Sequence, residues 1–492
     1  MTVRLTASDF YTFFSPSKCE LRVYLKHIGK AEAPPGPYEE VLFRLGERHE
    51  AVHLATFPEY IDLSKGHLEE REKKTREAVE LGAPLIYQAV LRTTHKLHDG
   101  EYEILGEPDF LMRHRDSYIV RDSKISRRIT ESDHPEILRQ LELYGWLYER
   151  LIGESPVGLE IHAGTGEIIK IPYDGGSAAL QVLEHLARLK IAASEPYSPV
   201  GWSKCVGCPF YGHCWPRAEA NRDVALIHGV DQNLAAALKE QGITTVEELL
   251  GYFDEESLAE FQRPWGSRMQ RVGKKALSII RMARAMSEGK EIMIQLPSIP
   301  DYPNYVMFDL EGLPPQLDEL EKIYLWGMRV FGEEKSDFMP AVAGFGQEGD
   351  EEGWRTFLDK AEVIFDKYGD IPFVHWHHYE KTRLKIYIER YGDPGGVADR
   401  VKRNLLDLLP MTRESMALPI PSYSLKVVEK YVGFKRTLDD VAGDWAMAKY
   451  IEAVETEDSD KRNELMNEIL VYNREDLEAT WAVLNWLKSK VS

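Results

Sequence analysis

The chain contains little cysteine and no long apolar segment. Cysteine accounts for 4 of the 492 residues, which is too few for a disulfide framework. No run approaches the about 20 apolar residues that cross a bilayer, and the opening MTVRLTASDFYTFF has no small-residue cleavage site. A phosphate-binding loop of the form G-x-x-x-x-G-K-[ST] is also missing. We therefore expect a cytoplasmic protein without a membrane segment or an ATPase motor of its own.

Acidic residues outnumber basic ones, and the excess is uneven. The formal net charge is −20. Residues 1–222 hold 28 basic and 33 acidic residues, a net of −5, and the remaining residues hold 33 and 48, a net of −15. Length alone favours about two to four domains. The uneven charge predicts two functional halves, the second more acidic than the first.

Two acidic residues and a lysine stand close together in a stretch with the pattern of strands. The runs YEILGEPDFLMR and YIVRDSKIS, separated by HRDS, predict a β-hairpin. Asp109 and Asp122 then lie on adjacent strands, and Lys124 projects from the same face as Asp122. Two carboxylates beside an ammonium can hold a divalent cation and a polarised water, which is the chemistry of phosphodiester hydrolysis. An isolated D-x-K, by contrast, is usually an ordinary solvated hairpin face.

The surrounding motifs resemble the RecB-like branch of the PD-(D/E)xK nucleases. That family carries, in order, a histidine on an early helix, a G-x-x-D strand, a D-x-K strand and a Q-x-x-x-Y helix. The matching segments here are LGERHE, GEPD, DSK and QLELY. The resemblance implies catalytic roles for His49, Asp109, Asp122, Lys124, Gln140 and Tyr144, with His49, Asp109 and Asp122 as ligands of Mg²⁺ or Mn²⁺. His53, one helical turn later, is the alternative to His49.

Three cysteines fall within CVGCPFYGHC, and the fourth lies almost two hundred positions upstream. In the iron–sulfur members of the RecB-like family, one cysteine precedes the nuclease core and three follow it. The resemblance therefore implies a 4Fe-4S cluster, held by Cys19, Cys205, Cys208 and Cys214, that clips the two ends of the domain together. A tetrahedral zinc, with His213 as a substitute ligand, and buried thiols are the alternatives.

A second acidic pattern occupies the C-terminal part. In YVMFDLEG, Asp309 and Glu311 alternate along one strand, so both carboxylates face the same side. In YNREDLEAT, Tyr472 and Asp476 are one helical turn apart. Between them, PFVHWHHYEKT leads from a strand into Glu380 at the start of a helix.

This order resembles the DnaQ-like exonucleases of the RNase H-like superfamily. The resemblance implies a two-metal site with Asp309, Glu311, Glu380 and Asp476 as ligands and with Tyr472 orienting the water. The second motif usually carries aspartate, and the glutamate at position 380 departs from it. Glutamate reaches one methylene farther and can still ligate a cation. A degenerate fold used only for binding is the alternative.

The segment 223–290, between the two acidic patterns, reads as wholly helical. The run IHGVDQNLAAALKEQGITTVEELLGY resembles a helix-hairpin-helix module, whose amides hold DNA phosphates, but only Gly229 stands at its first turn, so a helical spacer is the alternative. Residues 263–284 contain seven basic residues and no acidic one. They predict a nucleic-acid-binding strip that includes Arg263, Arg268, Arg271, Lys274 and Lys275. A solvated helix face paired with the acidic C-terminal part is the other interpretation.

These patterns predict an α/β protein in three parts. They are a PD-(D/E)xK restriction-endonuclease-like domain at 1–222, a helical helix-hairpin-helix-like linker at 223–295 and an RNase H-like domain at 296–492. The whole order resembles bacterial and archaeal RecB-like nucleases, some of which continue into a helicase, so a helicase here would be a separate partner. We expect a metal-dependent nuclease that acts on single-stranded DNA in repair or defence. A nucleic-acid-binding assembly protein with one or both sites inactive, and an RNA-processing nuclease, are the alternatives.

Overall fold

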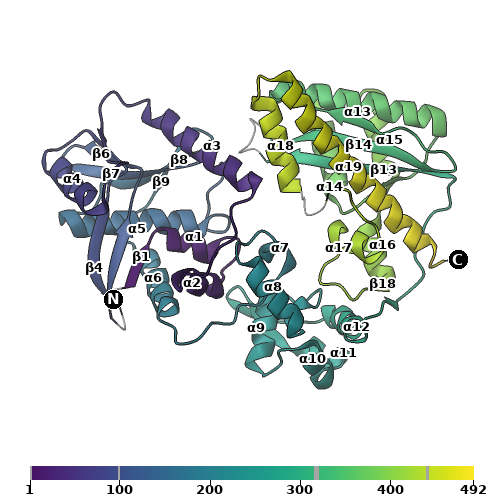
Figure 1. Cartoon of the computed structure of the whole chain (residues 1–492), viewed down its shortest axis with the longest axis horizontal. Coiled ribbons are helices and arrows are strands. Elements are labelled where there is room, and N and C mark those ends of the chain that lie inside the picture. Colours follow the sequence, from purple (N-terminus) through teal and green to yellow (C-terminus); the bar gives the residue numbers. More distant parts are fainter. Residues whose placement is uncertain (1–2, 98–99, 315–320, 439–442, 492) are drawn as a thin grey trace. The chain divides into compact units, whose positions relative to one another are not determined.

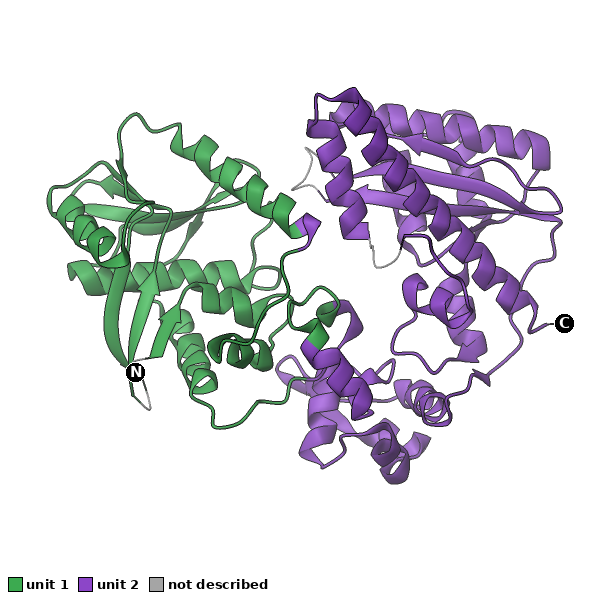
Figure 2. Cartoon of the chain, viewed as in Figure 1, with its two compact units in different colours: residues 1–35, 39–198, 204–212 green, residues 36–38, 199–203, 213–492 purple. Residues whose placement is uncertain are grey.

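The chain forms two compact α/β units, coloured separately in Figure 2. The computed structural model describes residues 3–97, 100–314, 321–438 and 443–491 (Figure 1). Unit 1 comprises residues 1–35, 39–198 and 204–212, and unit 2 comprises residues 36–38, 199–203 and 213–492. Within these described ranges, no helix is both long enough and apolar enough to cross a membrane.

Two sheets form the frame of unit 1. The larger sheet contains, in spatial order, β2 (Ile61–Asp62), β3 (Leu85–Tyr87), β6 (Phe110–His114), β7 (Ser117–Lys124), β8 (Gly158–Ala163) and β9 (Ile168–Ile171). The smaller sheet contains β1 (Val3–Thr6), β5 (Gly100–Gly106) and β4 (Leu91–Leu97). Because β7 and β8 are parallel, a helix connects them, as parallel strands require.

That connecting helix, α5 (Pro135–Ile152), packs on strands of both sheets. It begins with proline in its first turn and ends at Gly153 in the left-handed conformation, the usual start and stop signals. The other helices of this part are α1 (Ser8–Phe14), α2 (Glu20–His27), α3 (Pro37–Leu54), α4 (Leu68–Glu80), α6 (Ser177–Lys190), α7 (Trp202–Cys205) and α8 (Tyr211–Ala220). The division into two units falls within α3, α7 and α8, and residues 213–220 of α8 belong to unit 2.

The predicted hairpin is present, but its first strand is shorter than the sequence pattern indicated. β6 and β7 pair antiparallel. The run YEILGEPDFLMR, however, breaks at Glu107 and Pro108, and its first half forms β5 in the other sheet. Proline has no N–H to donate to a ladder, which explains why neither strand continues through position 108.

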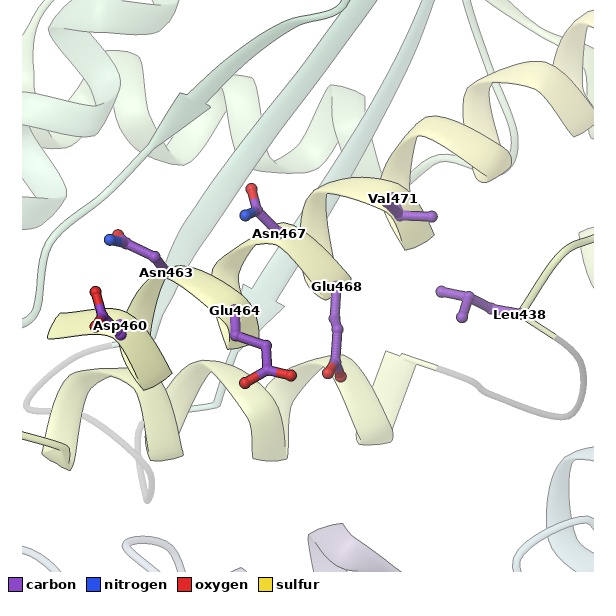
Figure 3. A pocket seen from close by; sticks show the side chains of 7 residues that line it. All are labelled: Leu438, Asp460, Asn463, Glu464, Asn467, Glu468 and Val471. Carbon is purple, nitrogen blue, oxygen red and sulfur yellow. The ribbon is translucent and has the colours of Figure 1, made fainter. Parts of the chain in front are cut away.

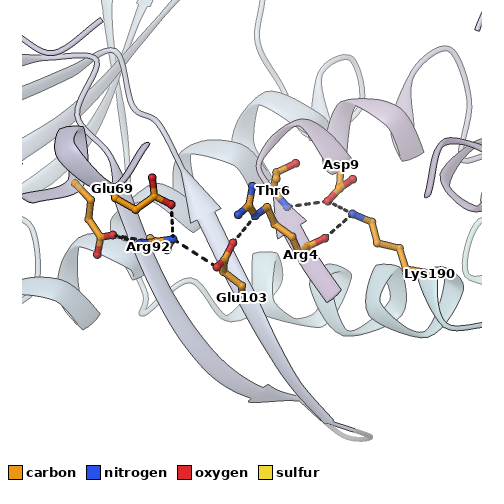
Figure 4. A network of polar contacts seen from close by, with 8 residues as sticks. Arg4, Thr6, Asp9, Glu69, Arg92, Glu103 and Lys190 are labelled. Carbon is orange, nitrogen blue, oxygen red and sulfur yellow. Dashed lines mark hydrogen bonds and ion pairs between the residues drawn. The ribbon is translucent and has the colours of Figure 1, made fainter. Parts of the chain in front are cut away.

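A polar network attaches the first strand to the rest of unit 1 (Figure 4). The Asp9 carboxylate accepts hydrogen bonds from the backbone N–H of Thr6 at 2.7 Å and from Lys190 Nζ at 2.6 Å. Lys190 Nζ also donates to the carbonyl of Arg4 at 2.8 Å. The network therefore joins β1 and α1 to the C-terminal end of α6. These elements lie near opposite ends of the sequence of unit 1.

Unit 2 starts with a small helical region interrupted by a hairpin. Its helices are α9 (Gln232–Glu240), α10 (Val246–Tyr252), α11 (Glu255–Glu260) and α12 (Lys275–Glu288). The expectation of a wholly helical segment 223–290 is wrong, because β10 (Gln262–Trp265) and β11 (Arg268–Arg271) form an antiparallel hairpin. Gly266 adopts a positive φ of 60° in the two-residue turn, a conformation that glycine supplies without strain.

A five-stranded mixed sheet forms the frame of the C-terminal part. In spatial order it contains β15 (Met339–Val342), β14 (Lys322–Gly332), β13 (Asn304–Leu313), β16 (Phe373–His375) and β17 (Leu405–Asp407), and a small pair is formed by β12 (Ile292–Met293) and β18 (Met416–Ala417). β13 pairs antiparallel with β14 and parallel with β16. The helices are α13 (Gly346–Tyr368), α14 (Tyr379–Tyr391), α15 (Val397–Arg403), α16 (Leu408–Ser415), α17 (Leu425–Tyr431), α18 (Gly443–Glu455) and α19 (Ser459–Lys488).

Stacked aromatic side chains fill the core between this sheet and α13. The rings of Trp326 and Phe357 stack with centroids 4.5 Å apart, and Phe308 stacks on Phe357 at 5.6 Å. All three side chains are almost fully buried. The long helix α19 also packs against β13 and β14. Residues near its middle therefore contact β13, the strand that carries Asp309 and Glu311.

Candidate metal centres

Three carboxylates converge in unit 2. Asp309 and Glu311 on β13 and Asp476 on α19 each offer an oxygen, and these atoms lie within 4.8 Å of one another. The two strand residues share a face because side chains alternate along a strand. A bulge between Glu311 and Gly312 shifts the register next to them. Such a set of oxygen ligands suits Mg²⁺ or Mn²⁺, so the residues present fit the expected ion.

The crowding raises the proton affinity of the two carboxylates on β13. Burial, together with the charges of Asp476 and Glu311, raises the pKa of Asp309 well above its usual range. Burial and the Asp476 charge raise the pKa of Glu311 to about 8. A divalent cation would compensate this repulsion by replacing the protons. The electrostatics of the group are therefore those of a cation site.

Glu380 and Tyr472 lie beside this group, not within it. Glu380, the second residue of α14, is buried, and His375 Nδ1 lies 3.1 Å from its Oε2. Its charge is close enough to contribute to the raised pKa of Asp309. Tyr472 lies one turn before Asp476 on α19, and burial raises the pKa of its hydroxyl. Their roles as a metal ligand and as the residue that orients water stay predictions.

Four residues that the motifs do not mark contact the acidic group, three of them directly and Glu429 through Arg436. Asn473 Nδ2 donates to Asp309 Oδ2 at 2.7 Å. Arg436 Nη2 donates to Asp476 Oδ1, and its Nε donates to Glu429 Oε1 at 2.6 Å. Lys426 Nζ lies 3.9 Å from Asp476 Oδ1. Asn473 could have been found, because it is three residues before Asp476 on one helix face, but no spacing signal marks the other three.

In unit 1 the structure brings Asp109, Asp122 and Lys124 together. Asp109 Oδ2 accepts from the backbone N–H of Ser123 at 2.7 Å, and Lys124 Nζ lies 2.7 Å from Asp122 Oδ2. Burial and the Asp122 charge raise the pKa of Asp109 well above its usual range. The Asp122 charge, in turn, raises the pKa of Lys124 although burial opposes it. Among the described residues, no third ligand joins these two aspartates in a group as tight as that of unit 2.

A further carboxylate that the motifs did not mark lies close to Asp109. Gln88 Nε2 donates to Asp109 Oδ1 at 2.9 Å and to Glu50 Oε1 at 2.6 Å, so one amide bridges the two acids. Glu50 follows His49 directly on α3. No motif distinguishes Glu50 from the other glutamates of that helix.

His49 and its alternative His53 belong to one stack of three imidazoles. His162 lies between them, with ring centroids 4.2 Å from His49 and 3.9 Å from His53. Burial, followed by the charge of Arg121, lowers the pKa of His53 to about 4, and burial beside the other two rings lowers that of His162 to about 4. His162, on β8, was not expected from the motifs. The stack does not distinguish His49 from His53 as the metal ligand, so the role of His49 stays a prediction.

Gln140 and Tyr144 contact each other on α5, as their spacing predicts. Gln140 Nε2 donates to Tyr144 Oη at 2.6 Å. Tyr144 is buried, and burial together with the Asp122 charge raises the pKa of its hydroxyl. A Cβ on Gly106 would lie 2.6 Å from a ring carbon of Tyr144. The glycine of the G-x-x-D motif is therefore required by the close approach of this tyrosine.

The four cysteines are half-buried. Burial raises the pKa of the Cys208 thiol, and Cys19, which is also in unit 1, adds to that rise. Cys205 is in unit 1 as well, whereas Cys214 falls in the range of unit 2. In the part of the chain that the structure describes, no set of three or more thiols is gathered as tightly as the carboxylates. The ligand geometry therefore does not show the expected cluster.

The predicted basic strip is divided between the surface and the interior. Arg263 is 4 % exposed, with its guanidinium 2.9 Å from Asp231 Oδ2. Arg268, Lys274 and Lys275 are exposed, and Arg271 is exposed with an ion pair to Glu260 at 2.7 Å. Four of the five residues are therefore at the surface, and the fifth supports the base of the hairpin.

A cavity of about 530 Å³ lies along α19 (Figure 3). Its lining residues are Leu438, Asp460, Asn463, Glu464, Asn467, Glu468 and Val471. None of them belongs to the three-carboxylate group. The cavity is therefore separate from the candidate metal centre, although the same helix contributes to both.

Comparison with known proteins supports the assignment of the C-terminal part. A sequence model of the RNase H superfamily matches residues 306–488, a range that contains all three carboxylates. No curated protein matches the chain. The crystal structure of SSO0001 aligns with 36 % of this chain and 96 % of its own length, at 18 % identity and a TM-score of 0.20, which is too low to assign a fold. Residues 306–488 thus form an RNase H-like domain with a carboxylate group typical of metal-dependent nucleases.

Proposed function

We propose that the chain is a metal-dependent nuclease that hydrolyses phosphodiester bonds of DNA, with single-stranded DNA as its substrate. The observation that carries this proposal is the convergence of Asp309, Glu311 and Asp476 inside a domain of the RNase H superfamily. Buried carboxylates with raised proton affinity are costly for a fold to maintain, and they are common where a cation or a reaction requires them.

The chain's own residues would prepare the phosphate and the water for reaction. A bound Mg²⁺ or Mn²⁺ supplies positive charge to the scissile phosphate and lowers the pKa of its water. Asp309, Glu311 and Asp476 hold the ion, and Asn473 fixes the orientation of Asp309. Tyr472, one helical turn before Asp476 on α19, would orient the attacking water.

A second active site in unit 1 is part of the proposal. Asp109 and Asp122 would bind the cation, together with His49, and Lys124 would stabilise charge that develops on the phosphate. The hydrogen bond from Ser123 and the ion pair between Lys124 and Asp122 support a preorganised arrangement. Gln140 and Tyr144 would orient substrate or water from α5. The proposed domains are those at 1–222, 223–295 and 296–492.

The cysteines and the basic residues complete the proposal. A 4Fe-4S cluster on Cys19, Cys205, Cys208 and Cys214 would stabilise the N-terminal nuclease domain. The exposed Arg268, Arg271, Lys274 and Lys275 would contact DNA phosphates. We place the protein in the cytoplasm, with a separate helicase supplying single strands.

A cleavage assay on DNA labelled at either end tests both sites. Asp122→Ala should abolish one activity and leave the other, and Asp309→Ala should do the reverse, because each change removes a ligand from a different site. A loss of about 10²-fold or more is expected for the affected activity. Matched RNA strands serve as the alternative substrate. Cleavage of RNA alone would favour an RNA-processing nuclease, and binding of DNA without any cleavage by the wild-type protein would favour a binding protein.

A further inference from the structure

Gln88, the residue directly after β3, contacts the candidate site of unit 1 with its backbone and with its side chain. Its backbone N–H donates to the carbonyl of Asp109 at 2.8 Å, and its own carbonyl accepts from Arg71 Nη2 at 3.1 Å. Its side-chain Nε2 donates to Asp109 Oδ1 at 2.9 Å and to Glu50 Oε1 at 2.6 Å. Both partners of the amide are carboxylate oxygens, which accept, so the nitrogen of the amide faces them. One residue therefore holds Asp109 at two points.

The backbone of Gln88 has an unfavourable conformation. Its φ of 55° lies in the left-handed region, which residues other than glycine seldom occupy. A glycine would form the same bend without strain. Residues held in this region cluster at functional sites, where the surrounding contacts fix them. The side chain of Gln88, which glycine lacks, is what the strained position adds to the site.

The contacts of Gln88 orient the carboxylate of Asp109. Oδ1 accepts from Gln88, and Oδ2 accepts from the backbone N–H of Ser123 at 2.7 Å. A carboxylate has about four lone-pair sites, so each oxygen can bind a cation after it has accepted one hydrogen bond. The second aspartate is adjacent, since Asp122 Oδ1 lies 3.4 Å from the backbone nitrogen of Asp109. Two neighbouring buried carboxylates fit Mg²⁺ or Mn²⁺, and hydrogen bonds that orient a ligand raise the affinity for the ion.

The other hydrogen bond of the amide reaches α3. Glu50 follows His49, the residue of α3 that is proposed as the third ligand. Val41 and His53 are the buried residues among the 18 of this helix, so polar contacts matter for its placement. The bond from Gln88 to Glu50 thus fixes the turn of α3 that carries His49 relative to Asp109.

We propose that Gln88 is a positioning residue of the metal centre in unit 1, and that its amide holds Asp109 and the His49 turn of α3 in the arrangement that binds the divalent cation. The inference rests on the proposed nuclease function of unit 1 and adds to it a residue that acts through the ligands. A role in the bend after β3 alone would require the backbone conformation and not the amide.

Two substitutions separate the amide from the bend. Gln88→Gly keeps the bend and removes the side chain, and Gln88→Met keeps most of the volume and removes the hydrogen bonds. Each should weaken Mn²⁺ binding by unit 1 about tenfold to a hundredfold, the usual effect of losing a group that orients a metal ligand. Arg115→Gly is the matched control and should leave Mn²⁺ binding unchanged, because Arg115 has a similar φ of 57° in the exposed turn between β6 and β7.

Mn²⁺ binding is measured without substrate, by electron paramagnetic resonance of the free ion. All proteins are full-length chains that carry Asp309→Ala, so that the carboxylate group of unit 2 lacks a ligand. The Mn²⁺ bound by unit 1 is the part that Asp122→Ala abolishes. Unchanged affinity in Gln88→Gly or in Gln88→Met overturns the inference, and an equal loss in Arg115→Gly also counts against it. If Asp122→Ala abolishes no Mn²⁺ binding, the proposed metal centre of unit 1 fails, which is a different result from an unchanged Gln88 variant.

Discussion

At the scale of single residues, two glycines are as important to the candidate sites as the acids. A Cβ on Gly327 would lie 1.8 Å from Asn473 Oδ1, so only glycine allows Asn473 to approach β14 and reach Asp309. Gly106 has the same relation to Tyr144 in unit 1. The spacing of the acids could be predicted from the sequence, because strand and helix periods fix it. The need for glycine at these positions could not be predicted, since it depends on contacts between segments that are distant in the sequence.

Gly106→Ala should destabilise unit 1. The added methyl group must displace the ring of Tyr144 and the side chain of Leu147, both within 2.8 Å of its position, and overpacking of this kind costs about 2 kcal/mol. Urea denaturation measures the loss. Gly158→Ala is the matched control, since no atom lies within 4 Å of its Cβ. Equal stability of the two variants would mean that the close approach of Tyr144 does not require glycine at position 106.

The carboxylates of unit 2 make stability depend on pH. The pKa of Glu311 is about 8 in the folded protein, against an ordinary value of 4.5. The folded state therefore holds a proton that the unfolded chain releases, and this contribution to stability is lost as pH rises from about 4.5 through 8. In EDTA, the wild-type protein should lose ~3 kcal/mol more than Glu311→Gln between pH 6 and pH 9. Denaturant titrations at both pH values measure this, and identical pH dependence would contradict it.

At the scale of secondary-structure elements, the predicted motifs fall on the expected strands and helices, and the errors occur where a turn was overlooked. Asp309 and Glu311 lie on β13, and Tyr472 and Asp476 lie on α19. The hairpin β10–β11 was missed, although WGS between alternating residues is a turn signal. The pattern of 223–290 as a whole predicted helix, and the two strands are too short to show a clear alternation.

The hairpin β10–β11 exposes an apolar and basic surface suited to nucleic acid. Trp265 and Met269 are 53 % and 59 % exposed, and Arg268 pairs directly with Trp265 across the hairpin. Trp265→Ala and Arg268→Ala should each weaken binding of single-stranded DNA about threefold to tenfold, because one loses base stacking and the other a phosphate contact. Fluorescence anisotropy at two salt concentrations measures both, and only Arg268→Ala should reduce the salt dependence.

Arg263→Ala should behave differently from its neighbours. Since this side chain is buried and paired with Asp231, its loss should lower the free energy of unfolding by about 1–3 kcal/mol. Arg355→Ala, at an exposed pair on α13, is the control for both experiments and should leave DNA binding and stability unchanged. If Arg263→Ala weakened DNA binding without lowering the free energy of unfolding, Arg263 would belong to the DNA-binding surface.

At the scale of the whole molecule, the sequence indicated several α/β parts, and the described chain divides into two units. The match to the RNase H superfamily confirms an RNase H-like domain in the C-terminal part. The spacing of the cysteines in the sequence does not predict whether their thiols lie close together in the fold. Their function depends on tertiary contacts that only metal analysis can test.

Protein purified without oxygen should contain about four iron atoms and absorb broadly in the visible range. Cys19→Ser should reduce the iron content and lower the melting temperature of unit 1, since it removes the ligand nearest the N-terminus. Elemental analysis and calorimetry measure these quantities. Stoichiometric zinc without iron would show that the cysteines bind a tetrahedral zinc ion and not a cluster. An unchanged melting temperature of Cys19→Ser would show that Cys19 does not stabilise unit 1.

The separation of the two candidate sites has a genetic consequence. Asp122 and Asp309 lie in units with hydrophobic cores of their own, so damage at one site need not disturb the other. If a cell requires both activities, two alleles of the same reading frame, one altered at Asp122 and the other at Asp309, would complement each other when they are expressed together. A single open reading frame would then behave as two genes in a complementation test.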